Sequence, residues 1–240
     1  MFCDRHYVHD LSGAEALEVL HQRGISVARP DLTFGSPDHT VQSKRSRGTA
    51  ALSATSLRLG TYRAEVQRQG IVSFDLDHPD QGIIHVAMPE LGLTLPGAVV
   101  VCGDSHTCTH GALGAIAWGI GVSDVTQVLA SQSVWVKRPK TLQISLEGAL
   151  PSRVSAKDVA LALLAQFGTQ IGVGSALEFS GEVVRQLPME GRLTLCNLSI
   201  ELGARQGFIA PDEVTLDWLK GRPYAPKGLD WSRAERAWRT

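Results

Sequence analysis

A buried strand that runs straight into a cluster of polar side chains constrains the fold of this chain more than any other feature. The apolar residues 97–101 lead directly into residues 102–107, Cys-Gly-Asp-Ser-His-Thr, and a glycine-rich segment follows at residues 111–121. Ligands bind at the carboxyl ends of strands in α/β sheets, where such a carboxylate, hydroxyl and imidazole can orient a substrate and exchange protons with it. The alternative is a polar turn that only satisfies its own backbone.

The composition narrows the classes of protein to consider. The 240 residues suffice for one large domain or two smaller ones. A net charge of −1 gives no electrostatic reason to expect binding to nucleic acid or to an anionic membrane. No apolar run is long enough to cross a membrane, and the first residues lack the basic region and apolar core of a signal peptide, so we expect a cytoplasmic protein.

Four cysteines, Cys3, Cys102, Cys108 and Cys196, are scattered along the chain. A chain without an export signal is expected to keep its thiols reduced. None of the spacings is as close as the C-x-x-C of iron–sulfur proteins with locally paired ligands. We therefore expect small core residues rather than disulfides or metal ligands.

Apolar periodicity and turn residues predict alternating helices and strands. Helices are expected at residues 11–23, 53–69, 123–132, 155–166 and 190–205, with Ser12 and Ser155 as N-caps. Strands are expected at residues 25–27, 71–76, 99–101, 141–146 and 176–179. This order predicts an α/β fold of parallel sheets between helices, in domains of residues 1–138 and 139–240. Residues 30–37 and the basic segment 43–48 are expected to be loops, and the tail from Lys220 to be poorly ordered.

Further polar motifs lie apart from the first. Asp38 and His39 follow a turn, and a carboxylate beside an imidazole raises the pKa of the imidazole. His85 lies in an apolar run, where most histidines are hydrogen-bonded core residues. Asn197 and Glu201 lie one turn apart on an expected helix, which on its own is compatible with an ordinary exposed face.

With residues 5–10, Arg-His-Tyr-Val-His-Asp, at the start, the order of these motifs resembles the aconitase superfamily and, within it, the isopropylmalate dehydratase family. The resemblance runs over nearly the whole chain. It implies an incomplete copy of the first two three-layer α/β/α domains of that family, without an N-terminal segment and without the C-terminal half. That half carries the three cysteines that hold the family's [4Fe-4S] cluster, so the resemblance implies this cofactor but no metal ligand in this chain.

The resemblance also implies roles for single residues. Asp38 and His39 match the family's Asp–His pair, in which the histidine is the acid near the leaving hydroxyl. His85 and Asp104 match a second catalytic pair. His106 matches a further catalytic residue, and His9 and Ser105 match substrate-binding residues. Asn197 and Glu201 match residues beside the cluster.

Some positions distinguish this chain within the superfamily. His9 is histidine in the dehydratases and glutamine in aconitase proper, which favours the dehydratases. His78 and His110 match no functional position and are expected to be structural. Thr40 and Val173 stand where the family commonly has Asn and Thr, which indicates relaxed constraint or a different substrate.

The function that the resemblance implies is that of a hydro-lyase, which isomerises 2- and 3-isopropylmalate by dehydration and rehydration in leucine biosynthesis. The implied partners are a dehydratase small subunit, a separate chain with the cluster domain, and a small hydroxy-dicarboxylate substrate. The sequence does not distinguish isopropylmalate from homocitrate-type or citramalate-type substrates. A truncated, non-catalytic paralogue or fragment remains the alternative. We expect the ends of the His85 and Asp104 segments to lie next to each other.

Overall fold

The computed structural model describes residues 1–41 and 54–239 of the chain, so the basic loop expected at residues 43–48 lies outside the described residues. The chain forms two compact units, each built from three stretches of sequence. The first unit consists of Met1–Ala87, Val101–Asp104 and Ile120–Val136, and the second of Met88–Val100, Ser105–Gly119 and Lys137–Thr240. The last passage between the units follows Val136. Contiguous domains of residues 1–138 and 139–240 stay a prediction.

A five-stranded sheet has the strand order β3-β2-β1-β4-β5. Its strands are β1 (Arg5–Val8), β2 (Thr33–Gly35), β3 (Val72–Ser73), β4 (Val99–Cys102) and β5 (Ile116–Gly119). β1 pairs in parallel with β2, and β2 in parallel with β3. The chain builds outward from β1 to β3 and then returns to place β4 on the other side of β1. Ligands of α/β sheets bind at such a reversal of strand order, outside the carboxyl ends of the strands.

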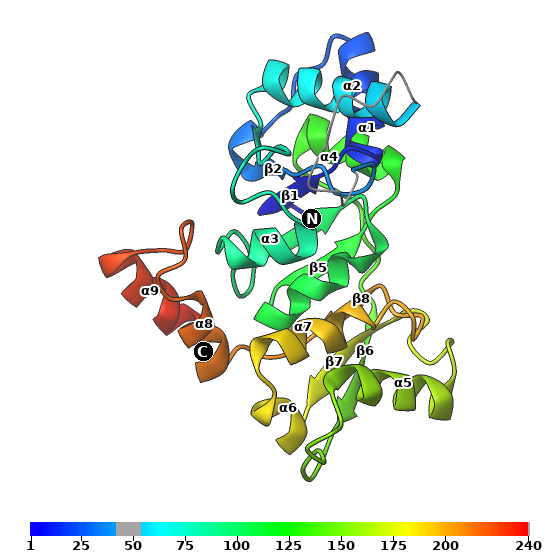
Figure 1. Ribbon diagram of the computed structural model, residues 1–240, viewed down its shortest axis with the longest axis vertical. Helices are drawn as coiled ribbons and strands as arrows, with labels where there is room; N and C mark the ends of the chain where they lie inside the picture. The colour runs from blue at the N-terminus through cyan, green and yellow to red at the C-terminus, as the bar shows by residue number, and fades with distance from the viewer. Residues whose placement is uncertain (42–53, 240) are drawn as a thin grey trace. The chain divides into compact units, whose positions relative to one another are not determined.

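Three α-helices accompany β1 and β2 in the first unit (Figure 1), namely α1 (Ser12–Gln22), α2 (Ala54–Gln69) and α4 (Val122–Ser131). α1 packs against both α2 and α4. Its apolar residues Ala16, Leu17 and Leu20 recur at helical spacing and are completely buried, which explains this packing. A short 3₁₀ helix, η1 (Pro30–Leu32), precedes β2, and α3 (Ile84–Glu90) begins in the first unit and ends in the second.

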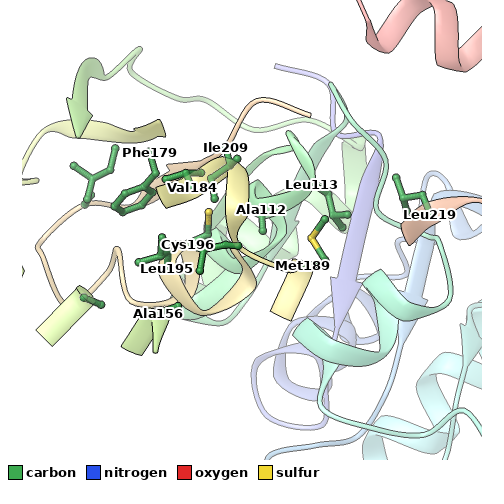
Figure 2. Packing of buried hydrophobic residues seen from close by; sticks show 14 of the residues in the cluster. Ala112, Leu113, Ala156, Phe179, Val184, Met189, Leu195, Cys196, Ile209 and Leu219 are labelled. Atoms are coloured by element: carbon green, nitrogen blue, oxygen red, sulfur yellow. The ribbon is translucent and has the colours of Figure 1, made fainter. Parts of the chain in front are cut away.

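The second unit contains a parallel three-stranded sheet in the order β6-β7-β8. Its strands are β6 (Lys140–Ser145), β7 (Ser175–Ser180) and β8 (Gln206–Phe208). Its helices are the 3₁₀ helix η2 (Ser105–Leu113) and the α-helices α5 (Ala156–Phe167), α6 (Glu182–Gln186), α7 (Met189–Asn197), α8 (Glu213–Leu219) and α9 (Gly228–Trp238). Apolar side chains of η2, α5, β7 and α7 form one buried cluster, in which Figure 2 shows Ala112, Phe179 and Leu195.

Glycine lets η2 pack closely on its neighbours α7 and β8. A Cβ atom on Gly111 would lie 1.8 Å from the carbonyl oxygen of Gly207 in β8. Such a distance excludes any side chain at residue 111, because a backbone carbonyl cannot move aside as a flexible side chain can. The first glycine of the segment that follows the polar motif therefore serves the packing of η2.

A completely buried arginine ties α7 to the start of α8. Arg192 Nη1 and Nη2 donate to the Asp212 carboxylate at 2.6 and 2.7 Å, and Asp212 also accepts the N–H of Thr215 as the N-cap of α8. Burial would raise the pKa of Asp212, but the hydrogen bonds and charge of Arg192 lower it. A bidentate pair of this kind satisfies a charge that is costly to bury alone.

Parallel sheets flanked by helices confirm the predicted α/β fold. Ser155 caps α5 as expected, in a capping box with Asp158. The cap expected at Ser12 is wrong, because Leu11 occupies the N-cap position of α1 and no side chain caps this helix. Among the described residues, no helix has the length and apolar character that a membrane span requires.

Four further expectations are wrong. Residues 25–27 form no strand, whereas β2 lies in the segment expected to be a loop, because it pairs with β1 on one side and β3 on the other. The helix expected to reach residue 205 ends at Asn197, so Glu201 lies in the turns that follow. The tail is not poorly ordered, because α9 forms there and buries Trp231.

Candidate acid–base site

Three strand ends of the first unit bring the predicted acid–base residues together. His9 and Asp10 follow β1, Asp38 and His39 follow β2, and Asp104 follows β4. β1 lies between β2 and β4 in the sheet, so these loops meet where the strand order reverses.

His39 lies between two carboxylates. Its Nδ1 is 2.6 Å from Asp38 Oδ1, and its Nε2 is 2.9 Å from Asp104 Oδ2. A carboxylate acceptor at each ring nitrogen favours a proton on both, so His39 is an imidazolium. The hydrogen bond to Asp104, followed by that to Asp38, raises the pKa of His39 to about 10. At neutral pH this ring therefore carries a proton that it can donate.

Asp104 joins His39 to a second histidine. Its Oδ1 is 2.9 Å from Nε2 of His85, which lies in the first turn of α3. Asp38 helps to hold that turn, because its Oδ2 accepts the N–H of Ile84 at 2.8 Å. The structure confirms that His85 and Asp104 meet. Where the sequence predicted two separate Asp–His pairs, one hydrogen-bonded chain connects Asp38, His39, Asp104 and His85.

The ring of His9 stacks on that of His39, with centroids 3.9 Å apart and planes inclined by 16°. Its Nδ1 accepts the N–H of Leu11 at 3.2 Å, which leaves the proton of a neutral ring on Nε2, 3.1 Å from Ser12 Oγ. Burial, followed by the positive charge of His39, lowers the pKa of His9. The ring is completely buried and supports His39 from one side. A direct contact of His9 with a substrate stays a prediction.

Ser12 explains the glycine of the polar motif. Its Oγ donates to the carbonyl oxygen of Gly103 at 3.3 Å, and a Cβ atom on Gly103 would lie 1.9 Å from that Oγ. The approach of α1 to the end of β4 therefore requires a residue without a side chain directly before Asp104. Ser12 thus binds the motif instead of capping its own helix.

Asp10 is a site residue that the sequence did not predict. It is completely buried, and its Oδ1 accepts the N–H groups of Asp38 and His39 at 2.9 and 3.0 Å. Its Oδ2 accepts the N–H of Thr40 at 2.7 Å and the Thr40 hydroxyl. Burial alone would raise the pKa of Asp10, but the hydrogen bonds from Thr40, His39 and Asp38 outweigh it and lower the pKa. Its position at a strand end beside His9 was the only local signal, since its partners lie 28–30 residues further along the chain.

Potential metal-ligand atoms of His9, Asp10, Asp38 and His39 lie within 4.8 Å of one another. Hydrogen bonds already engage them, because both nitrogens of each ring have partners and Asp10 accepts four donors. A cation here would also lie beside the charged His39 ring, which would repel it. This donor set fits an acid–base cluster better than a metal centre.

The second unit brings together the other four predicted site residues. Ser105 and His106 open η2, with Ser105 Oγ 3.2 Å from His106 Nδ1. His106 Nε2 lies 3.6 Å from Glu201 Oε1. Asn197 Nδ2 donates to Thr109 Oγ1, and this hydroxyl donates to the carbonyl oxygen of His106. The end of α7 and the turns after it therefore hold the polar start of η2, although Glu201 is not helical.

All four cysteines are free, and their complete burial is that expected of small core residues. Cys3 and Cys102 belong to the first unit, and Cys108 and Cys196 to the second. Burial raises the pKa of Cys3 to about 11 and that of Cys196, which lies in the apolar cluster of Figure 2, well above its ordinary value. Clusters bind thiolates, and no cysteine joins a group of three potential ligands among the described residues. These thiols do not fit the [4Fe-4S] cluster that the resemblance implies.

Comparison with known proteins identifies the family of the chain. The chain is 51% identical over 237 residues to 3-isopropylmalate dehydratase large subunit 1 of Bradyrhizobium diazoefficiens. The alignment covers 99% of this chain and 50% of that protein, so the chain spans about half the length of the curated relative it matches. The aconitase family (aconitate hydratase) matches residues 1–240, from the first residue to the last. On this evidence, the chain belongs to the aconitase family.

Proposed function

We propose that this chain supplies the acid–base residues of a hydro-lyase of the isopropylmalate dehydratase type, which isomerises 2- and 3-isopropylmalate in leucine biosynthesis. The observation that carries the proposal is the hydrogen-bonded chain of Asp38, His39, Asp104 and His85. Dehydration needs one group that gives a proton to the leaving hydroxyl and another that takes a proton from the neighbouring carbon. A charged imidazole linked through a carboxylate to a second imidazole offers both kinds of group in one place.

In this proposal His39 is the acid. Its Nε2–H turns from Asp104 to the hydroxyl of the substrate, which leaves as water. Asp104 meanwhile keeps its hydrogen bond to His85, so the carboxylate stays in place while the charge of His39 changes. The contacts of Ser105, His106 and His9 with a substrate, and the place of Asn197 and Glu201 beside a cluster, remain parts of the proposal.

The cofactor and the partners are also parts of this proposal. Members of the aconitase family bind a [4Fe-4S] cluster. The buried cysteines of this chain do not fit one, so we propose that its ligands come from sequence outside these 240 residues, on a separate chain. The relative is by name a large subunit, which supports a small subunit as a second partner. The proposed substrate is a small hydroxy-dicarboxylate, and the proposed location is the cytoplasm.

Reconstitution of the whole enzyme tests the proposal. This chain is combined with the part of the Bradyrhizobium relative that the alignment does not cover and with a dehydratase small subunit. The cluster is then rebuilt anaerobically, and isopropylmalate interconversion is measured. Homocitrate-type and citramalate-type acids are assayed in parallel to identify the substrate. We expect turnover of isopropylmalate. We expect His39→Gln to lower kcat by about 10²–10⁴-fold with little change in KM, because the lost proton acts on charge that develops in the transition state.

The chain offers a matched control for that variant. His78 lies 3.8 Å from Asp80 in an exposed Asp–His pair of the first unit, so His78→Gln should leave kcat unchanged. His110 is a poorer control, because it is completely buried 2.9 Å from Thr94 Oγ1 and its replacement would lower stability. A complex with an intact cluster spectrum but no turnover would refute the proposal in favour of the non-catalytic alternative. Equal damage from the His39 and His78 variants would refute the assigned role of His39.

A further inference from the structure

We propose that Asp10 is a positioning residue, which sets the geometry of the acid–base chain by holding the loop that carries Asp38 and His39. The inference deepens the proposed function. It rests on that function only for the statement that Asp10 matters for catalysis. The geometry itself can be measured without turnover. Asp10 would not touch the substrate, because its side chain is completely buried behind the loop that it holds.

The contacts of Asp10 span three consecutive residues. Both carboxylate oxygens accept two donors each, and the donors are the N–H groups of Asp38, His39 and Thr40 together with the Thr40 hydroxyl. Within the described residues these three N–H groups have no other hydrogen-bond partner. These three backbone N–H groups therefore depend on a single side chain, which comes from the end of β1.

The loop in turn fixes the members of the acid–base chain. Asp38 Oδ1 receives the His39 ring, while its Oδ2 receives the N–H of Ile84 at the start of α3. The residue after Ile84 is His85, whose ring binds Asp104. A shift of the loop would thus move His39 and His85 relative to the carboxylate that joins them.

Removal of the Asp10 charge should loosen this loop rather than unfold the chain. Asp38 and Thr40 are half-buried and His39 is exposed on one side, so water can replace the lost acceptor at the three N–H groups. In Asp10→Asn the amide NH2 group would face either the N–H of Thr40 or the N–H groups of Asp38 and His39. Donors that face each other repel, so one end of the loop would move away. The charged and titratable groups that face His39 are His9, Asp38 and Asp104, and their distances to its ring would then change.

Titration of His39 by NMR in the whole chain tests this role. The intact protein should show the raised pKa of His39, and Asp10→Asn should lower it by about 1 or more, the usual effect of weakening one contact with an opposite charge. Asp10→Glu keeps the charge and should restore at least half of the difference. Asp158→Asn is the matched control, because it also removes a carboxylate that accepts a backbone N–H, that of Ser155, but in the second unit, and it should leave the His39 titration unchanged.

Two results would overturn the proposal. The first is an Asp10→Asn variant that is less stable but whose His39 has the same pKa as in the intact protein. This result would show that Asp10 serves only to stabilise the fold. If Asp10→Asn does not fold, Thr40→Val takes its place, because it removes one donor to Asp10 Oδ2 and should itself lower the pKa of His39. The second refuting result is an unchanged pKa of His39 in that variant. Failure of the reconstituted enzyme to turn over would refute the proposed function alone, since the titration needs no substrate.

Discussion

The charge of His39 should depend more on Asp104 than on any other residue, and Asp104→Asn tests this dependence. The Asp104 carboxylate is the largest cause of the raised pKa of His39, ahead of Asp38. The asparagine keeps the size of the side chain but removes its negative charge. An opposite charge at hydrogen-bond distance raises a histidine pKa by about 1–3, so the variant should lower the pKa of His39 by that amount.

The same coupling predicts how stability changes with pH. A pKa difference of 1 corresponds to about 1.4 kcal/mol. The side chain of His39 is 29% exposed, so solvent screens its interaction with Asp104. The free energy of that interaction therefore lies near the lower end of the range for such pairs, at about 1–2 kcal/mol. Because the folded pKa lies above the unfolded value of 6.5, this stabilisation is complete below pH 6.5 and is lost as the pH rises through about 10. The intact protein should therefore exceed Asp104→Asn in unfolding free energy at pH 6, and the difference should shrink by pH 10.

Imidazole NMR between pH 5 and pH 11 measures the titration, with the His39 signals assigned from His39→Gln, and urea unfolding at several pH values measures the stability. Asp80→Asn, beside the exposed His78, is the control and should leave the His39 titration unchanged. A pKa of His39 near 6.5 in the intact protein would refute the argument. So would an Asp104→Asn variant whose His39 titrates as in the intact protein.

Three further predictions concern stability and the cluster. Gly111→Ala should lower the unfolding free energy, measured by urea unfolding, by about 1–3 kcal/mol or more, because its Cβ would meet the Gly207 carbonyl. Gly60→Ala, in the open interior of α2, should raise the unfolding free energy by about 0.5–1 kcal/mol in the same assay. Asp212→Ala should lower the unfolding free energy by about 3–5 kcal/mol, because it leaves the completely buried guanidinium of Arg192 unpaired. Arg192→Met should lower it by less, because the Asp212 side chain that it leaves unpaired is 38% exposed. Equal losses, or a larger loss in Arg192→Met, measured by urea unfolding would contradict this. Reconstitution of the chain alone with iron and sulfide should give no stoichiometric [4Fe-4S] spectrum, and a stoichiometric spectrum that disappears when the cysteines are replaced would contradict the fit described above.

Features with local causes were predictable from the sequence. The capping box of Ser155 and Asp158 needs only four consecutive residues, and its helix was expected within one or two residues of its bounds. The meeting of His85 with Asp104 had no local signal and was expected from the family resemblance. The burial of the four cysteines was expected from their scattered spacing.

Features with distant causes were not predictable. β2 has only three residues and no apolar alternation, and it exists because β1 and β3 pair with it on both sides. Asp10 acts on residues 28–30 positions away, and nothing near it in the sequence indicates that loop. Glu201 kept the helical spacing from Asn197 although α7 had already ended, so the spacing alone was misleading. The tail did carry a usable local signal, since Trp231 and Glu235 lie one helical turn apart in α9 and hydrogen-bond to each other.

The alternation of the chain between its two units also has a consequence for how the protein is made. The first unit lacks one helix and a sheet strand until residue 136 has left the ribosome, and the second lacks α7 and β8 around η2 until residue 208 has done so. Contacts between residues so far apart in sequence close late and fold slowly. During synthesis the apolar surfaces of β1, β2 and η2 stay uncovered for much of the chain, which makes nascent or truncated forms prone to aggregate. No single proteolytic cut can separate the two units, because even a cut after Val136 leaves Met88–Val100 and Ser105–Gly119 of the second unit on the fragment that contains the first. Limited proteolysis should therefore yield nicked chains that stay associated rather than a stable half.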